Sequence, residues 1–135
     1  MKLLLNEAAV MEKIYESAEN YLETILILKE RNGSVRSIDI VRELDFSKPS
    51  VSVAMKNLKE KGLISIDGSG NISLTEEGLT IASEVYDRHK VLSRALIELG
   101  VSEETAAVDA CRIEHYISSE SFDKIKEYIE KIHKQ

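Results

Sequence analysis

The chain has 135 residues, of which 43% are hydrophobic and 31% charged, a composition typical of an ordered globular protein. No uncharged apolar run approaches the roughly 18 residues that a membrane span requires, and the apolar start meets Glu7 and Glu12 instead of continuing as a signal-peptide core, so we expect a cytoplasmic protein without a membrane partner. The single cysteine, Cys111, excludes an internal disulfide and leaves either a buried small side chain or a reactive or ligating thiol.

The net charge of −6 argues against nucleic acid when it is taken as a sum, because DNA-binding proteins neutralise phosphates with lysine and arginine. The distribution is uneven. Residues 36–61 carry six basic and four acidic side chains, a net charge of +2, which leaves −8 for the remainder. This asymmetry has two interpretations. The basic region faces an anion and the remainder forms a carboxylate-rich site, or both are ordinary solvated helix faces.

The first predicted helix spans residues 17–29 and ends at Asn32-Gly33. Its apolar residues recur at helical spacing: Tyr21, Leu22, Ile25, Leu26 and Leu28. Residues 6–15 either continue this helix or form a separate short one.

Residues 37–74 have the element order of a winged helix-turn-helix. A short helix, 37–44, has an apolar side of Ile38, Val41 and Leu44. A longer helix begins after the N-cap Ser47, carries Pro49 in its first turn, where a missing N–H costs nothing, and stops at Gly62. Its inward residues are Val51, Ala54, Met55 and Leu58. Two alternating runs, "LISI" and "NISL", flank the turn Asp67-Gly68-Ser69-Gly70 and predict a β-hairpin.

The rest of the chain predicts three helices. The first is capped by Thr75 and continues to Gly100 with the stripe Leu79, Ala82, Val85, His89, Leu92 and Leu96. The others span 102–117 and 121–132, the latter with Phe122, Ile125, Ile129 and Ile132 on one side. Helices without a sheet would leave apolar surface exposed, so we expect a homodimer. The expected fold is mainly α, with a winged helix-turn-helix at residues 1–74 followed by an all-helical dimerisation domain at residues 75–135.

The longer helix of residues 48–61 is the candidate DNA-reading element. In a helix-turn-helix the second helix enters the major groove, and its N-terminus favours a phosphate. Ser50 stands where a capping box would place a carboxylate, and serine avoids that charge against DNA. Capping alone, with lysines on a solvated face, is the alternative. The hairpin turn carries no cation, so we expect it to contact DNA only through backbone N–H groups or Ser69. The candidate DNA contacts are Arg36, Ser37, Ser47, Lys48, Pro49, Ser50, Ser52, Val53 and Lys56.

Cys111, Glu114 and His115 are the candidate metal ligands, because residues at i, i+3 and i+4 share a helix face. Thiolate, carboxylate and imidazole suit a borderline transition metal, whereas calcium or magnesium would not select sulfur. Three ligands from one helix cannot enclose an ion. His89 in the preceding helix is the best further candidate, and Glu23 on the first helix is another, with Asn20 near it. A packed cysteine and a hydrogen-bonded core histidine are the alternative.

Four stretches carry a family resemblance: "SAENYLETI", "SKPSVSVAMKNLKEKGLI", "RHKVL" and "DACRIEH". From about residue 17 to residue 131 the chain resembles the diphtheria-toxin-repressor family of iron- and manganese-dependent repressors. The resemblance implies a homodimer that binds operator DNA with a winged helix and uses a divalent metal as co-repressor. By position, His89, Cys111, Glu114 and His115 match metal ligands of the family, and Glu23 matches a carboxylate ligand of its manganese branch. The short length is similar to that of the manganese-type members, which lack an SH3-like domain.

The resemblance gives a mixed set of metal ligands. Cysteine at 111 is typical of the iron branch, and Glu23 of the manganese branch. Asn20 stands where those branches have Met and Asp, and only its amide oxygen can serve as a ligand. Ser93 and Ala107 replace two second-site ligands of iron regulators, and Val53 replaces a polar residue that faces bases. Because thiolate disfavours Mn(II), we expect Fe(II) first and Mn(II) second, with Zn(II), Co(II) or Ni(II) as surrogates.

The expected function is that of a metal(II)-activated transcriptional repressor that controls metal-ion homeostasis. One alternative is a metal-independent winged-helix regulator that senses a small ligand or the redox state through Cys111. An enzyme with Cys111 as nucleophile is a second, but the sequence has no recognisable oxyanion arrangement or orienting third group, so we expect no enzyme activity.

Overall fold

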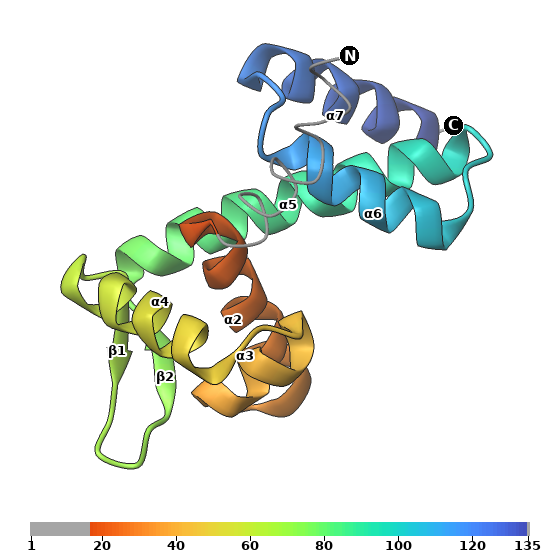
Figure 1. Cartoon of the computed structure of the whole chain (residues 1–135). Coiled ribbons are helices and arrows are strands. Elements are labelled where there is room, and N and C mark those ends of the chain that lie inside the picture. The colour runs from red at the N-terminus through yellow and green to blue at the C-terminus, as the bar shows by residue number, and fades with distance from the viewer. Residues whose placement is uncertain (1–16, 135) are drawn as a thin grey trace, which may run out of the picture. The chain divides into compact units, whose positions relative to one another are not determined.

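The computed structural model describes residues 17–134 (Figure 1). Within this range the elements are α2 (Ala18–Asn32), α3 (Ser37–Leu44), α4 (Lys48–Glu60), β1 (Ile64–Ile66), β2 (Ile72–Leu74), α5 (Glu76–Glu98), α6 (Glu103–Glu114) and α7 (Ser119–His133). The predicted fold class, a winged helix-turn-helix followed by helices, is confirmed. The alternatives for residues 6–15 lie outside the described residues. The chain divides into two compact units between Ser83 and Glu84, within α5.

The first unit is built on an apolar core shared by its three helices and the hairpin. Leu22 and Ile25 of α2, Ile40 of α3, and Val51 and Met55 of α4 are at most 2% exposed. The strands pair in antiparallel register, with Ile64 opposite Leu74 and Ile66 opposite Ile72. The N–H of Ile72 also donates to the carbonyl of Val35 at 2.7 Å, which ties the loop before α3 to the hairpin. This bond fixes the hairpin, the wing of the fold, beside the start of α3.

Two predicted inward faces in this unit are wrong in detail. In α3 the fully buried residue is Ile40, whereas Ile38 is only half-buried, because the short helix turns Ile40, Val41 and Leu44 toward the core. In α5 the predicted inward Leu79 is 45% exposed, because the neighbouring Gly78 is the residue that faces the chain at Leu63.

Gly78 is required by space and not by an unusual backbone angle. A Cβ at this position would fall on the carbonyl oxygen of Leu63. That oxygen accepts from the N–H of Thr75 at 3.1 Å, and the Thr75 hydroxyl donates to the carbonyl of Gly62 at 2.7 Å. The predicted cap is confirmed, since Thr75 Oγ1 also accepts from the N–H of Gly78. The start of α5 is thus held against the end of the loop after α4.

The other helix ends follow local chemistry. Ser47 is an N-cap as predicted, Ser17 and Ser102 are N-caps as well, and Gly33 ends α2 with a left-handed φ of 81°. The last helix begins two residues earlier than predicted, because its cap is Ser118, whose hydroxyl accepts from the N–H of Ser121 at 3.1 Å.

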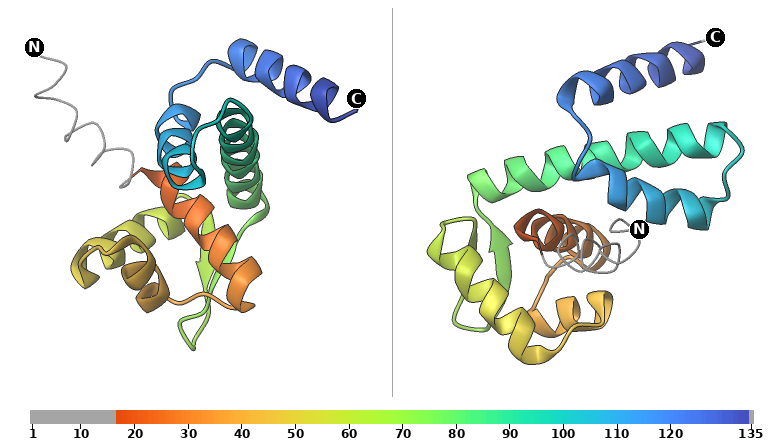
Figure 2. Two further views of the ribbon diagram at one scale, coloured as in Figure 1. Left: turned by 90° about the vertical axis from the view of Figure 1, so that its right-hand side faces the viewer. Right: turned by 45° about the horizontal axis from the view of Figure 1, so that its top comes forward.

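The second unit consists of the C-terminal part of α5 with α6 and α7. The C-terminal part of α5 and α6 lie side by side (Figures 1 and 2). Its small core contains Leu92, Ala110 and Phe122, one from each helix. The ion pair of Lys126 with Asp87 at 2.9 Å and the contact of His133 Nε2 with Glu98 Oε1 at 3.3 Å connect α7 to α5.

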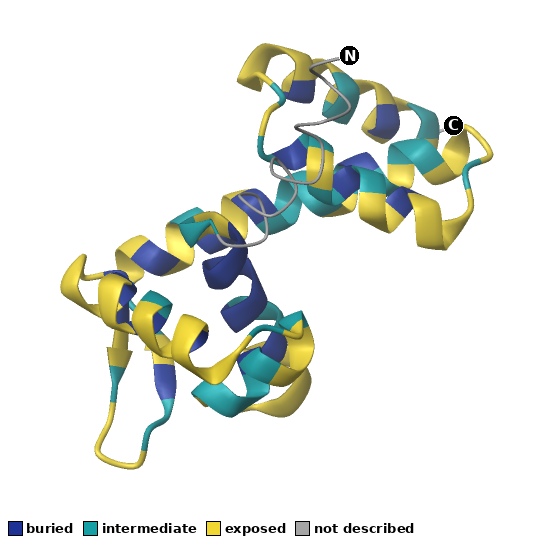
Figure 3. Ribbon diagram, viewed as in Figure 1, coloured by how far each residue is buried: buried dark blue, intermediate teal, exposed yellow. Residues whose placement is uncertain are grey.

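Much apolar surface of the second unit stays exposed (Figure 3). Leu99, Tyr116 and Tyr128 are each more than 60% exposed, and Ile97 and Val108 more than 40%. The expected pairing with another copy of the chain would cover this surface. Among the described helices, none combines the length and the apolar character needed to cross a bilayer.

Candidate metal centre and nucleic-acid interface

The end of α6 brings the three clustered candidate ligands together. The helix ends at Glu114, earlier than the predicted residue 117, and His115 follows as its C-cap. His115 nevertheless keeps a right-handed helical backbone, with φ of −85° and ψ of −14°, so the spacing of the helix face is preserved. One donor atom each of Cys111, Glu114 and His115 lies within 4.8 Å of the others.

Glu114 is the centre of this cluster. Its side chain is 0% exposed, and its two oxygens are approached by two different imidazoles. His89 Nδ1 of α5 lies 2.9 Å from one oxygen, and His115 Nε2 lies 3.4 Å from the other. A buried carboxylate is costly unless a cation or hydrogen-bond donors surround it, so a cation bound beside Glu114 would stabilise the site.

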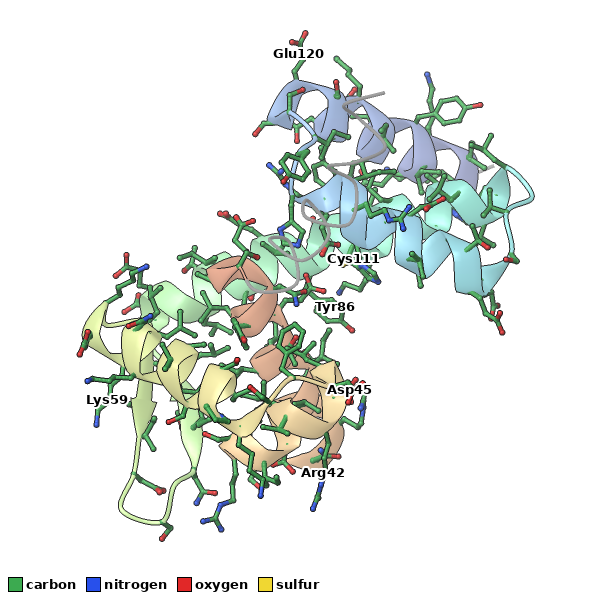
Figure 4. All side chains as sticks on the ribbon, viewed as in Figure 1. Arg42, Asp45, Lys59, Tyr86, Cys111 and Glu120 are labelled. Carbon is green, nitrogen blue, oxygen red and sulfur yellow. The ribbon has the colours of Figure 1, made fainter. Side chains whose placement is uncertain are left out.

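The donors of this unit fit a divalent transition metal. They comprise a carboxylate, the imidazoles of His89 and His115, and the half-buried thiol of Cys111, which projects from α6 (Figure 4). Sulfur and nitrogen together favour a borderline metal such as Fe(II), Co(II) or Zn(II) over calcium or magnesium. A bound cation would balance the buried charge of Glu114 and join α5 to α6.

The remaining candidate ligands belong to the first unit. Asn20 and Glu23 are three residues apart on α2, and they are 5% and 6% exposed. Their association with the donors of α5 and α6 stays a prediction from the resemblance. Of the two residues that replace second-site ligands of iron regulators, Ser93 has a buried hydroxyl without a hydrogen-bond partner among the described residues, and Ala107 is exposed. Neither side chain supplies a charged ligand.

The candidate DNA-reading residues lie at the N-cap and on the outer side of α4, and at the N-cap and first residue of α3. Ser37 is half-buried, and all others are exposed: Arg36, Ser47, Lys48, Pro49, Ser50, Ser52, Val53 and Lys56. Ser47 Oγ accepts from the N–H of Ser50 at 3.2 Å and donates to its hydroxyl at 2.8 Å, so these serines also cap the helix. Lys59 of α4 and Arg42 of α3 point away from the body of the unit (Figure 4).

In the structure the cationic side chain of Arg36 lies beside the wing, where the sequence predicted no cation. The guanidinium Nη2 of Arg36 lies 3.2 Å from the position that a Cβ would take at Gly70. The turn itself is held by Asp67, whose carboxylate accepts from the N–H groups of Asn71 and Ser69 at 2.9 Å. The Asn71 backbone bond is the main cause that lowers the pKa of Asp67, and the charge of Arg36 adds to it. The only sequence signal was the basic residue itself, since 34 positions separate Arg36 from Gly70.

Two family models together match most of the chain. Residues 13–71 match the N-terminal DNA-binding domain of iron-dependent repressors, and residues 75–135 match their metal-binding and dimerisation domain. The chain therefore belongs to the family of metal-dependent transcriptional repressors, as the resemblance implied.

Individual relatives include regulators of more than one metal. The chain is 34% identical over 118 residues to an uncharacterised HTH-type transcriptional regulator of Methanocaldococcus jannaschii, covering 86% of this chain and 94% of that protein. It is 34% identical over 116 residues to the transcriptional regulator MntR of Escherichia coli O157:H7, covering 86% and 75%. With the iron-dependent repressor IdeR of Mycobacterium tuberculosis it shares 32% over 111 residues, covering 82% of this chain and 48% of IdeR. These relatives are transcriptional regulators and not enzymes.

Among solved structures, the manganese regulator SloR matches with a TM-score of 0.75 and 25% identity, covering 84% of this chain and 54% of that one. The repressor ScaR with bound Zn²⁺ matches with a TM-score of 0.69 and 25% identity, covering the same shares. The chain thus spans about half the length of these regulators.

Proposed function

We propose that this chain is a metal(II)-activated repressor that binds operator DNA as a homodimer in the cytoplasm and controls metal-ion homeostasis. Residues 1–74 are the DNA-binding domain, and residues 75–135 bind the metal and form the dimer. The observation that supports this most strongly is the fully buried Glu114 carboxylate between His89 and His115, with Cys111 beside it.

The proposed metal ligands come from three helices. His89, Cys111, Glu114 and His115 hold the metal within the second unit, and Glu23 joins from α2, with Asn20 contributing its amide oxygen. When bound, the metal supplies positive charge that neutralises the carboxylates and a cross-link between the helices that carry them. Through Glu23, the DNA-binding half is then held in one orientation relative to the dimer axis.

That orientation determines whether the two recognition helices of the dimer fit the operator. Two recognition helices must be spaced by about 34 Å to enter successive major grooves. A coupling between metal and DNA of roughly 1–3 kcal/mol would raise operator affinity about 5- to 150-fold. The exposed residues of α4 contact bases and phosphates, and Arg36 brings a cation to the wing.

Fe(II) is the proposed physiological metal, with Mn(II) second and Zn(II), Co(II) or Ni(II) as surrogates. The relatives include both manganese and iron regulators, so the choice between these metals is argued from the proposed ligands of this chain. The Cys111 thiolate disfavours Mn(II), which lies at the weak end of the divalent affinity order and prefers oxygen ligands.

The decisive experiment is DNA binding by the purified chain under anaerobic conditions at fixed salt. The probe is a duplex selected from a random pool by the Fe(II)-loaded protein, tested with Fe(II), Mn(II), Zn(II) or a chelator. We expect the chelator to lower affinity about 5- to 150-fold and Fe(II) to restore it at lower concentration than Mn(II). DNA binding that is indifferent to the chelator would favour the metal-independent regulator instead.

A Co(II) titration tests the ligands separately from DNA. We expect a sulfur-to-cobalt charge-transfer band that disappears in the Cys111→Ala variant. The absence of any such band in the unmodified chain would contradict the thiolate ligand.

A further inference from the structure

Arg88 of α5 makes a set of contacts that the proposed metal ligands do not explain. Its Nη1 donates to the carbonyl oxygens of Ile117 at 3.2 Å and of Glu114 at 3.4 Å, and its Nη2 donates to Ser119 Oγ at 3.3 Å. Its guanidinium carbon lies 5.4 Å from the ring centroid of Phe122. One side chain therefore contacts the end of α6, the following loop and the start of α7.

These contacts are suited to the end of a helix. The last carbonyls of a helix lack intrahelical donors and carry partial negative charge. α6 ends at Glu114, so its carbonyl and that of Ile117 lie in this region. A guanidinium is planar, permanently charged and carries five N–H donors in a fixed geometry, so Nη1 can donate to two carbonyls while Nη2 donates to the Ser119 hydroxyl.

Glu114 is consequently held at two points by consecutive residues of α5. His89 contacts its side-chain carboxylate at 2.9 Å, and Arg88 contacts its main-chain carbonyl. Arg88 has no lone pair to offer a metal, so its contribution is to fix where the backbone of Glu114 lies relative to His89. His115, the next residue, is fixed by the same anchor.

We propose that Arg88 is a positioning residue of the metal centre, which sets the separation between the α5 ligand and the α6 ligands before any metal binds. This inference rests on the proposed metal-binding function. A purely structural role would link Arg88 to folding stability alone, whereas a positioning role links it to metal affinity beyond any loss of stability.

Asp87 offers a matched control in the preceding position. Its carboxylate pairs with Lys126 of α7 at 2.9 Å, so it connects α5 to α7 through a charged contact, and that pair does not include the end of α6. The variants to compare are Arg88→Met, Arg88→Lys and Asp87→Asn in the full chain. The probe is Co(II) alone, followed by its absorption spectrum, with thermal unfolding of the metal-free variants measured in parallel.

For Arg88→Met we expect the Co(II) dissociation constant to rise about 10-fold, the lower end of the effect of losing a group that orients a metal ligand. Arg88→Lys should recover part of this affinity, and Asp87→Asn should leave it unchanged while lowering the unfolding temperature. In the metal-free protein, hydrogen exchange at the amides of Tyr116 and Ile117, which both donate to Ile113, should accelerate in Arg88→Met and not in Asp87→Asn.

Equal Co(II) affinity in Arg88→Met and the unmodified chain would overturn the inference, as would an equal loss in Asp87→Asn. If Arg88→Met fails to fold, Arg88→Lys carries the test, and unchanged affinity and exchange in that variant would also overturn it. An unmodified chain that binds no Co(II) would instead contradict the proposed metal function itself.

Discussion

The two compact units differ in where they place polar groups. In the first unit, α3, α4 and the hairpin bury only apolar side chains, and their cations lie on the surface. The buried polar or charged residues of the described part of the chain are Asn20, Glu23 and Thr24 on α2 and Glu114 on α6. Among the described residues, buried polar side chains are therefore confined to α2 and α6, two of the three helices that carry proposed metal ligands.

This difference implies that the units are stabilised in different ways. The first unit has a continuous core of buried apolar side chains, and DNA binding does not require this core to change. The second unit has a small core of Leu92, Ala110 and Phe122 beside a buried carboxylate. We infer that its stability responds to whatever charge balances Glu114, and that the first unit responds mainly to packing.

The largest expected effect is that of Glu114→Gln, which keeps the size of the side chain and removes its charge. We expect Co(II) affinity to fall by more than about 100-fold. Loss of a group that only orients a metal ligand lowers metal affinity roughly 10- to 100-fold, and loss of a direct ligand should lower it further. Isothermal titration measures this, with Glu127→Gln, an exposed carboxylate of α7, as the control. Retained affinity in Glu114→Gln would show that the buried carboxylate is structural.

The second prediction concerns packing in the first unit. Gly78→Ala places a methyl group on the Leu63 carbonyl, and the strain should lower the free energy of unfolding by about 1–3 kcal/mol. Gly68→Ala in the wing turn meets no atom within 4 Å and should change it little. Urea denaturation of both variants measures the difference. Equal stabilities would show that the start of α5 can shift away from Leu63 without loss.

Gly78 also illustrates what the sequence could not predict. The order of the elements followed from spacing and caps along the chain, and so did the shared face of Cys111, Glu114 and His115. The side of α5 that faces the hairpin depends instead on how closely two backbones approach, and the sequence favoured Leu79 over Gly78 for that side.

The same limit applies to contacts between distant residues. His89 was a candidate ligand because it interrupts an apolar stripe, but its bond to one Glu114 oxygen required the packing of α5 on α6. The sequence also did not predict that Arg36 lies beside Gly70 or that Arg88 donates to the Glu114 carbonyl. Long basic side chains leave no periodic pattern in a sequence that would indicate their distant partners. Sequence thus identified the candidate ligands more readily than the residues that we propose to position them.

The third prediction concerns the wing. Arg36→Ala should lower DNA affinity at all sequences and reduce the slope of log affinity against log salt by about 1, as expected for one lost phosphate contact. Arg31→Ala removes the same charge from the end of α2, where the guanidinium pairs with Glu43 at 3.0 Å, and should leave the slope unchanged. Fluorescence anisotropy at several salt concentrations measures both. An unchanged slope in Arg36→Ala would remove the wing cation from the DNA interface.

The smallest expected effect is the pH dependence of the wing turn. The bonds from the Asn71 and Ser69 backbone lower the pKa of Asp67 below its ordinary value of 3.8, so the folded state favours the charged form. The resulting stability is fully present above pH 3.8 and is lost as the pH falls through the lower folded value. Carbon-detected NMR titration should therefore give Asp67 a midpoint below 3.8, and the Asn71 and Ser69 amide signals should move with the same midpoint. Because Asp67 lies at the surface, screening by water keeps its effect on global unfolding small. A midpoint at or above 3.8 would mean that the turn does not hold its bonds in solution.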